Sequence, residues 1–443
     1  MCDTVVVTGE ATKDGVTLFG KNSDREPNEA HHILQIPAAD HPAGSRVKCT
    51  YIEIPQAEHT HAVLLAKPFW IWGAEMGANE HGLVIGNEAV FTKAPYDKKP
   101  SLIGMDFLRL ALERATGSRQ AVDVITTLLE EFGQGGNCGF EHKLYYHNSF
   151  LIADSIEAWV LETAGRHWAA KQVKGIYTIS NRLSIENDWD LASADLITFA
   201  IEKGWCKNRD DFSFARCYSD YLYTKFSDSG RRASCSGTFL SARWKEGIDV
   251  KTVMSALRDH GDFSDPGEGI TGSSVCMHAG FGPVRGSQTT GSMVSHLHPE
   301  RATHFITGTA APCTGIFKPV WTDTPFPETK VIPAGTYDES SLFWKHEAIH
   351  RAVLRDFRHR SELIAGDRDR FENDFIEKAL KSAKDNVDRR AELANRCYDE
   401  AVSYEATWLR KVISSTTKTR LNFLYRKAWK QFNRKAKMRV EGF

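Results

Sequence analysis

The sequence predicts an α+β fold in which antiparallel sheets are covered by layers of helices, with a helical appendage at the C-terminal end. Segments that alternate apolar and polar residues come first and last in the main part of the chain, and helical patterns lie between them. This order of strands, helices, helices and strands differs from repeated strand–helix–strand units. Residues 339–438 then show a highly charged helical pattern with almost no Gly or Pro.

The first strands are expected in segments rich in β-branched residues: 4–10 (TVVVTGE), 15–23 (GVTLFGKNS), 47–55 (VKCTYIEIP), 60–68 (THAVLLAKP) and 81–91 (HGLVIGNEAVF). The first two segments are joined through Lys13-Asp14-Gly15, which is a turn sequence. We therefore expect them to form a hairpin.

Two helices are expected next, at residues 102–115 and 118–136; the second begins at a Ser and ends at glycines. Residues 149–173 indicate a hairpin or meander that turns at Asp154-Ser155, and the segment GIYTISN predicts a strand ending at Asn181. The sheet structure is thus expected to resume after the helices.

The remaining main part is expected to be helical from about 187 to 262, with a polar stretch at 226–237 that could form a loop. Short strands are expected in SSVCMHAGFG, SQTTGSMVSHL and THFITGTAAP. A Pro-rich junction at 319–335 follows. We place a domain boundary there, which gives a main domain at 1–335 and a basic helical extension at 336–443.

Composition indicates an ordinary globular protein. Hydrophobic residues make up 41%, charged residues 26%, and the net charge is -1, so nothing in the bulk charge favours nucleic acid or an anionic membrane. No apolar run approaches the roughly 18 residues of a membrane span, and no secretory signal is visible. The nine cysteines show no short paired spacings, which indicates reduced thiols. We expect a cytoplasmic protein.

The end of the chain, KTRLNFLYRKAWKQFNRKAKMRV, interleaves Lys and Arg with Leu, Phe, Tyr and Trp. Such a helix could bind an acidic partner, RNA or a membrane surface. It could equally pack an apolar stripe on the body of the protein and leave its basic residues in water. The sequence is also compatible with a homo-oligomer.

Cys2 is the first candidate for chemistry. If Met1 is removed, this residue carries both a thiol and a free α-amine. An α-amine has an ordinary pKa of about 8, so it can take the thiol proton at neutral pH and later donate it to a leaving amine. Cys2 would then be a nucleophile with its own base. The alternative is that a small residue at position 2 merely permits Met1 removal.

The expected hairpin places further polar residues beside Cys2. Lys21, Asn22, Asp24 and Arg25 return along the second strand. The Asp24 carboxylate can hold the α-ammonium, and a cation at 21 or 25 can lower the pKa of the thiol.

The motif WGAEMGANEHGLVIGNEAV at 72–90 places Asn87 in a strand after a Gly-rich turn. An Asn side chain there can donate to a developing oxyanion. Trp70, Trp72 and Asn79 are candidates for substrate binding, although the two Trp side chains could equally be core aromatics.

No metal site is expected. The neighbouring histidines 31 and 32, 59 and 61, and 296 and 298 lie in no array of Cys and His with zinc spacing. No Walker or dinucleotide-binding pattern is present either. The sequence therefore predicts no metal or organic cofactor.

Several motifs carry a family resemblance: CDTVVV…FGKNSDRE, SRVKCTYIEIPQAEHTHAV, WIWGAEMGANEHGLVIGNEAVFTK, EEFGQGGNC, EAWVLETAGRHWAAK and ISNRLSI. They resemble the secernins and the related dipeptidase A group of cysteine peptidases, both in the N-terminal-nucleophile hydrolase superfamily. The resemblance is dense from residue 2 to about 190 and faint beyond 335. It implies a four-layer αββα sandwich with Cys2 at the end of a strand between the sheets.

The resemblance also implies roles for individual residues. Cys2 is the nucleophile, Asp24 orients its amine, and Lys21 stands where the related bile-salt hydrolases and penicillin acylases usually have Arg. Lys keeps the positive charge but loses bidentate carboxylate recognition, and Arg25 can compensate.

Three further residues are assigned in the same way. Asn181 matches an Asn that hydrogen-bonds the oxyanion or the α-amine, Asn87 matches an oxyanion donor, and Arg232 is expected to approach the thiol. The implied function is hydrolysis of dipeptides or small peptides. A non-peptide amidase or acyltransferase, and a secernin-like non-catalytic adaptor in exocytosis, are the alternatives.

Overall fold

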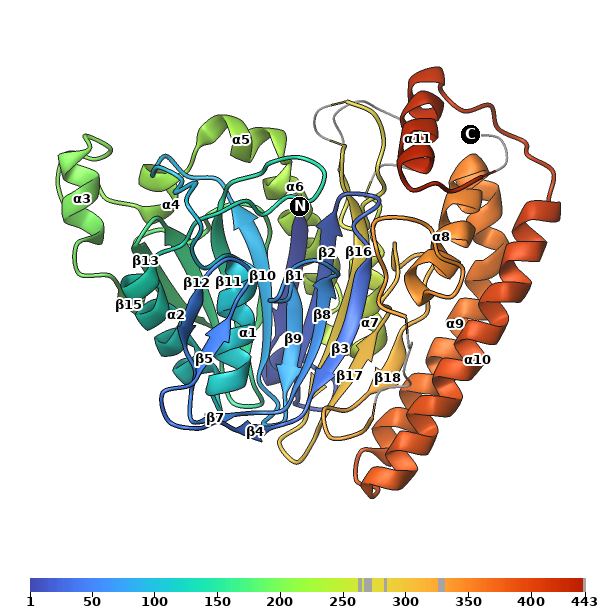
Figure 1. The fold of residues 1–443 in the computed structure, drawn as a ribbon, viewed down its shortest axis with the longest axis horizontal. Coiled ribbons are helices and arrows are strands. Elements are labelled where there is room, and N and C mark those ends of the chain that lie inside the picture. The colour runs from blue at the N-terminus through green and yellow to red at the C-terminus, as the bar shows by residue number, and fades with distance from the viewer. Residues whose placement is uncertain (262–264, 267–272, 283–284, 326–330, 441–443) are drawn as a thin grey trace.

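The structure is a computed structural model that describes residues 1–261, 265–266, 273–282, 285–325 and 331–440. Two large antiparallel sheets form its centre (Figure 1). The six-stranded sheet has the order β14 (Ile176–Ile179), β1 (Cys2–Val7), β2 (Thr17–Arg25), β16 (Gln288–Leu297), β17 (Ala302–Ile306) and β18 (Lys318–Val320).

The eight-stranded sheet has the order β15 (Leu191–Ala192), β13 (His167–Val173), β12 (Ala158–Ala164), β11 (His147–Ala153), β10 (Val84–Val90), β9 (Met76–Asn79), β8 (Val63–Pro68) and β3 (His31–Ile36). β1 packs against β10 and β11, so the two sheets lie face to face. Strands that are buried on both faces carry near-continuous apolar runs, as in the segment VLLAKP.

Helices cover both outer faces. α1 (Gly104–Arg114) and α2 (Ser118–Phe132) pack on the eight-stranded sheet, and α6 (Ser229–Ser241) and α7 (Val250–Leu257) pack on the six-stranded sheet. The molecule is therefore a four-layer αββα sandwich, which confirms the expected fold class. Shorter elements complete the main part: η1 (Gly9–Ala11), β4 (Ala39–Asp40), β7 (His59–Thr60), α3 (Leu196–Glu202), α4 (Phe214–Tyr218), α5 (Tyr221–Phe226) and η2 (Trp244–Glu246).

The expected hairpin of the first two strands is confirmed. β1 pairs with β2 so that Cys2 lies opposite Ser23 and Thr4 lies opposite Lys21. β2 also pairs with β16, whose register shifts between Thr289 and Gly291. The start of β1 and the end of β2 therefore lie together at one end of the sandwich. Figure 1 shows the N-terminus at the same end as α5, α6 and α11.

Three local predictions were wrong. Residues 47–55 form two short paired strands, β5 (Arg46–Lys48) and β6 (Glu53–Pro55), because the segment turns back on itself. The polar stretch 226–237 belongs mostly to α6 rather than to a loop. Residues 273–282 form no strand, and their polar groups bond to neighbouring segments instead.

The C-terminal part consists of α8 (Leu342–Val353), η3 (Leu354–Asp356), α9 (Phe357–Ser382), α10 (Val387–Ser414) and α11 (Phe423–Lys435). α9 and α10 pack beside β18 at the edge of the six-stranded sheet. Trp408 and Trp429 belong to the same hydrophobic core as Val5 and Leu18. The domain boundary at 335 stays a prediction.

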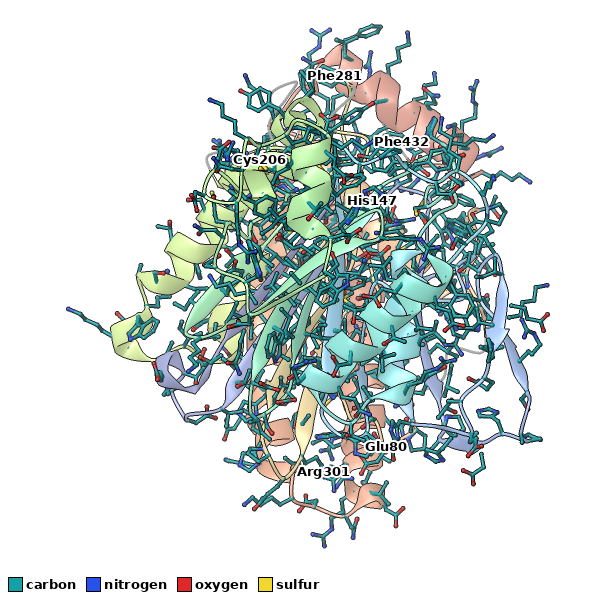
Figure 2. All side chains as sticks on the ribbon, turned by 90° about the vertical axis from the view of Figure 1, so that its left-hand side faces the viewer. Glu80, His147, Cys206, Phe281, Arg301 and Phe432 are labelled. Atoms are coloured by element: carbon teal, nitrogen blue, oxygen red, sulfur yellow. The ribbon has the colours of Figure 1, made fainter. Side chains whose placement is uncertain are left out.

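α11 packs its apolar side on the body. Tyr425 and Trp429 are buried, and Trp429 Nε1 donates to the Ala279 carbonyl at 3.1 Å. Figure 2 shows Phe281 and Phe432 at one end of the molecule, and Glu80 and Arg301 at the other. The basic residues of this region are exposed: Arg426, Lys427, Lys430, Arg434, Lys435, Lys437 and Arg439. No helix in the described part of the chain combines the length and the apolar composition that a membrane span requires.

Candidate active site

Cys2 lies at the start of β1, and its thiol is buried on the side that faces the eight-stranded sheet. Its Sγ lies 3.9 Å from Oε2 of Glu75, and the backbone N–H of Asp24 donates to it at 3.4 Å. Burial raises the pKa of the thiol to about 11, although Lys21 and the N-terminal ammonium oppose this shift. The resting thiol is therefore neutral near pH 7.

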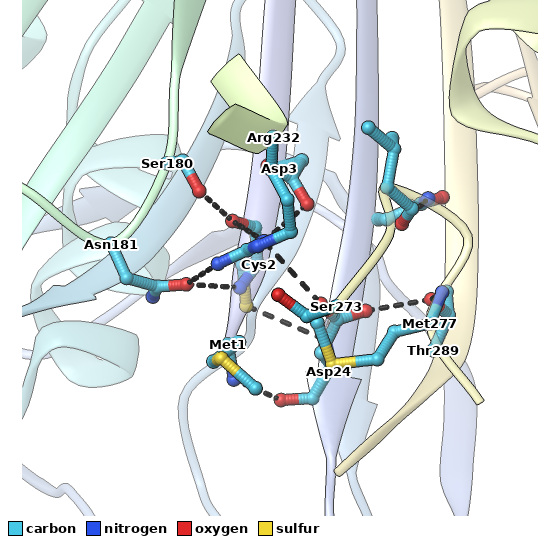
Figure 3. Close-up of polar contacts among 12 residues, drawn as sticks. Met1, Cys2, Asp3, Asp24, Ser180, Asn181, Arg232, Ser273, Met277 and Thr289 are labelled. Carbon is cyan, nitrogen blue, oxygen red and sulfur yellow. Dashed lines mark hydrogen bonds and ion pairs between the residues drawn. The ribbon is translucent and has the colours of Figure 1, made fainter. Parts of the chain in front are cut away.

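The nitrogen of Cys2 has a defined partner in Asn181, which follows β14. It donates to Oδ1 of Asn181 at 2.8 Å, and Nη2 of Arg232 donates to the same oxygen at 2.7 Å (Figure 3). The amide nitrogen of Asn181 donates to the Ala89 carbonyl at 2.9 Å. Because all three neighbours fix the orientation of the carboxamide, its oxygen must face Cys2.

Arg232, on α6, is completely buried and holds the backbone of β1. Its Nη1 donates to the Cys2 carbonyl at 3.1 Å and forms an ion pair with Asp3. We expected this guanidinium to approach the thiol. The structure brings it to the carbonyl and, through Asn181, to the nitrogen of the same residue.

Asp24 lies across the hairpin from Cys2 and is also buried. Its Oδ1 accepts from the Thr289 hydroxyl at 2.6 Å, and its backbone carbonyl accepts from the Met1 ammonium at 2.9 Å (Figure 3). Its Oδ2 lies 3.9 Å from Nη1 of Arg232. Burial raises the pKa of this carboxyl, while the N-terminal ammonium and Arg232 lower it in part. The Asp24 carboxyl therefore lies close to the positive charge of the N-terminal ammonium.

Lys21 is fully buried between the sheets. Its Nζ donates to the Asn87 carbonyl at 2.7 Å and to Oε1 of Glu88 at 3.1 Å. Burial lowers the pKa of Lys21, but the negative charges of the Cys2 thiolate, Glu88 and Glu75 outweigh burial and raise it. A Cβ at Gly86 would lie 2.6 Å from Lys21 Cδ, so the close approach of this side chain requires a glycine there.

Arg25 lies in a second ionic group at the same end of β2. Its Nη2 lies 2.6 Å from Oε1 of Glu29, and its Nη1 lies 3.2 Å from Oε1 of Glu75. The Trp70 indole donates to Oε1 of Glu29 at 2.8 Å. Arg25 therefore reaches Cys2 through Glu75, and Trp70 is connected to this group through Glu29.

Three predicted residues are not brought to Cys2. The Asn87 side chain donates to Oδ1 of Asn148 at 2.9 Å, Asn79 donates to backbone carbonyls at the end of α1, and Trp72 stacks under Arg109. Successive strand residues face opposite sides. Gly86 and Glu88 face the six-stranded sheet, so the Asn87 side chain points toward α1, and only its carbonyl serves the site.

Four residues at the site were missed by the sequence analysis. Glu75 lies within the motif 72–90, so that motif was sufficient to suggest it. Asp3 is adjacent to Cys2, and Glu88 is adjacent to Asn87. Thr289 lies far along the chain, and only the pairing of β16 with β2 brings it to Asp24.

Comparisons with known proteins give one family and several relatives. The sequence model of peptidase family C69 matches residues 1–228. A dipeptidase from Bifidobacterium longum is 28% identical over 220 residues, and a probable dipeptidase from Salmonella dublin is 24% identical over 241 residues. These alignments cover 44% and 49% of this chain, and 39% and 53% of the relatives' own lengths.

Solved structures with a similar arrangement include a conjugated bile acid hydrolase from Clostridium perfringens, with a TM-score of 0.44 and 14% identity over 72% of this chain and 92% of that one. A penicillin V acylase from Agrobacterium tumefaciens gives a TM-score of 0.41 and 14% identity over 75% of this chain and 88% of that one.

Proposed function

Because the chain belongs to peptidase family C69, we propose that it is a cysteine hydrolase that cleaves the peptide bond of dipeptides or other small peptides. The family match confirms the resemblance to dipeptidase-type cysteine peptidases that the sequence motifs indicated. Two relatives named as dipeptidases support the substrate class. The chain spans only about 39% and 53% of their lengths.

The observation that carries the mechanism is the placement of both Cys2 groups. The nitrogen donates to Asn181 at 2.8 Å, while the thiol of the same residue is buried and accepts from the Asp24 N–H. A neutral thiol is a weak nucleophile and needs a base. When Met1 is removed, the Cys2 nitrogen becomes an amine with a lone pair and can supply that base.

The reaction then follows from these positions. The amine takes the thiol proton, Sγ attacks the carbonyl carbon of the peptide bond, and the amine returns the proton to the leaving amino group. Water hydrolyses the resulting thioester. Lys21 stabilises the thiolate by charge, and Asn181 with Arg232 holds the amine in place.

The proposal departs from the expected mechanism in one part. Asn87 and Asn181 were both expected to donate to the oxyanion, but each side-chain amide nitrogen has another partner. For Asn181, the sequence analysis had named the α-amine as the alternative partner. We propose that Asn181 acts on the α-amine.

The proposed activity is tested with purified protein and a panel of dipeptides, with release of free amino acids as the measurement. Cys2→Ala should abolish turnover, and Cys2→Ser should retain at most a trace, since Ser keeps the amine but is a poorer nucleophile. Cys397→Ser, at a buried position in α10, is the matched control and should stay active.

Two other results would redirect the proposal. Cleavage of N-acyl amides but of no dipeptide, dependent on Cys2, would indicate the amidase alternative. Wild-type turnover by Cys2→Ala would exclude Cys2 as the nucleophile and favour the adaptor.

A cytoplasmic location is proposed as well. All nine cysteines lie in the described part of the chain, and no disulfide joins them there, as expected in a reducing compartment. The exposed basic residues around α11 support an acidic partner or an anionic membrane surface for this helix.

A further inference from the structure

Four side chains outside the active site converge on one point behind the six-stranded sheet. We name His260, Cys276, His278 and Cys313 the His/Cys cluster; their potential ligand atoms all lie within 4.8 Å of one another. Cys276, His278 and Cys313 are buried, and His260 is half-buried. His260, Cys276 and His278 lie between α7 and β16, and Cys313 lies between β17 and β18.

Three distances within the His/Cys cluster, all measured from Nε2 of His278, are close to the edges of a zinc tetrahedron. Nε2 of His278 lies 3.1 Å from Nε2 of His260, 3.7 Å from Sγ of Cys276 and 3.4 Å from Sγ of Cys313. Zinc bonds of about 2.0–2.1 Å to nitrogen and about 2.3 Å to sulfur place tetrahedral ligands about 3.3 Å apart for two nitrogens and about 3.5 Å apart for nitrogen and sulfur. The remaining ligand atoms lie within 4.8 Å of one another, so one Zn²⁺ can bind between the four atoms when they move closer together.

A second set of contacts orients His278 as a metal ligand. Its Nδ1 lies 3.0 Å from Nε2 of His350, and Nδ1 of His350 lies 3.0 Å from Oε1 of Glu347. Glu347 in turn pairs with Arg351 at 2.5 Å. An ionised Glu347 accepts from His350 Nδ1–H, so His350 Nε2 accepts from His278 Nδ1–H.

This order of donors leaves the lone pair of His278 on Nε2, which is the atom that faces the other three side chains. A metal-ligating histidine usually donates its other ring N–H to an acceptor that fixes its tautomer, and here that acceptor is His350, which is held by the Glu347 carboxylate. The orientation is therefore independent evidence for a ligand at the cluster, since it comes from α8 and not from the four residues themselves.

We propose that the His/Cys cluster binds one Zn²⁺ in a closed tetrahedral site with a structural role. Two sulfur and two imidazole ligands suit Zn²⁺, and four protein ligands leave no position for water or substrate. No sequence motif indicated the site, because only Cys276 and His278 are close in the chain.

The position of the site connects it to the proposed active centre. Met277 lies between two ligands, its N–H donates to the Thr289 hydroxyl at 3.0 Å, and its carbonyl accepts from the Thr289 N–H at 2.9 Å. The Thr289 hydroxyl donates to Asp24, as Figure 3 shows. A bound metal would therefore fix the segment that positions Asp24.

The test measures zinc in the full-length protein, purified without chelator and then freed of loosely bound metal. Elemental analysis should give about one zinc per chain. X-ray absorption should show two sulfur neighbours at about 2.3 Å and two nitrogen neighbours at about 2.0–2.1 Å. Exchange with Co²⁺ should produce thiolate-to-cobalt charge-transfer bands and the intense visible bands of a tetrahedral ion. These measurements need no variant.

Variants then assign the ligands. Cys276→Ser and Cys313→Ser should each lose most of the zinc, while Cys397→Ser should keep it, because Cys397 lies in α10 outside the cluster. Wild-type protein that holds no zinc after incubation with Zn²⁺, a zinc shell without sulfur, or a disulfide between Cys276 and Cys313 in the native protein would each overturn the proposal. None of these results depends on the peptidase activity.

Discussion

The side-chain oxygen of Asn181 lies 2.8 Å from the nitrogen of Cys2, and the same oxygen accepts from Arg232. One carboxamide therefore connects the first residue of β1 to α6. Because the proposed base is that nitrogen, its position depends on the hydrogen bond to Asn181.

Replacement of Asn181 should affect catalysis more than binding. Asn181→Ala leaves the α-amine without its acceptor, so kcat on a dipeptide should fall by about 10²-fold or more, with little change in KM. Steady-state kinetics on the purified variant measures both values.

Asn87→Ala is the matched control for this prediction. The Asn87 side chain bonds to Asn148 on the side facing α1, so its loss should lower the melting temperature and leave kcat per folded molecule nearly unchanged. The reverse pattern, with kcat lost in Asn87→Ala and kept in Asn181→Ala, would restore Asn87 as the oxyanion donor.

The pKa of the Cys2 thiol should differ between the chain that retains Met1 and the chain that begins at Cys2. Burial raises its pKa to about 11 in the chain that retains Met1. Alkylation requires the thiolate, so its rate at Cys2 should increase about tenfold per pH unit up to that value. In the chain that begins at Cys2, the ammonium lies on the same residue and should lower the midpoint.

The measurement follows modification of the Cys2 peptide by mass spectrometry, with the control that Cys2→Ser shows no label at position 2. Equal midpoints in the two forms would show that the amine does not act on the thiol.

Removal of α11 contacts should destabilise the whole fold. Trp429 is fully buried in the core that also contains Val5, so Trp429→Ala should reduce the free energy of unfolding by about 3–5 kcal/mol. Deletion of 418–443 should be at least as severe. Chemical denaturation monitored by circular dichroism gives these values.

The exposed charges of α11 provide the control. Lys430→Glu should change the free energy of unfolding by less than about 0.5 kcal/mol, while weakening any salt-dependent binding to an anionic surface. A stable, fully active deletion of 418–443 would instead show that α11 is a dispensable appendage.

The sequence predicted best where the pattern of side chains is local. The β-branched residues of TVVV and the pattern of VTLFGKNSD, with a turn at Lys13-Asp14-Gly15, were sufficient for the β1–β2 hairpin and for the placement of Asp24 beside Cys2. Residues 226–237 did not look helical because the side of α6 that faces the sheet carries polar groups such as Ser229, Arg232 and Ser236. The charge of Arg232 is paired there with Asp3.

Other features depend on strand register and on contacts between distant segments, which one sequence does not show. Asn87 was expected to donate to the oxyanion, but its side chain bonds to Asn148 on the other face of β10, and the face that a strand residue occupies depends on register. Thr289 reaches Asp24 only through the order of strands in the six-stranded sheet. The four residues of the His/Cys cluster are likewise brought together by the fold and not by their spacing in the chain. Neither a local motif nor composition encodes these contacts.

The central claim is that catalysis requires the free α-amine of Cys2. The most direct test compares dipeptide turnover with the fraction of chains that begin at Cys2, as determined by intact mass, across preparations in which removal of Met1 is blocked to different degrees. We predict that turnover per molecule rises in proportion to this fraction and vanishes when every chain retains Met1, because an amide nitrogen has no basic lone pair. Full turnover by protein that retains Met1 would contradict the account.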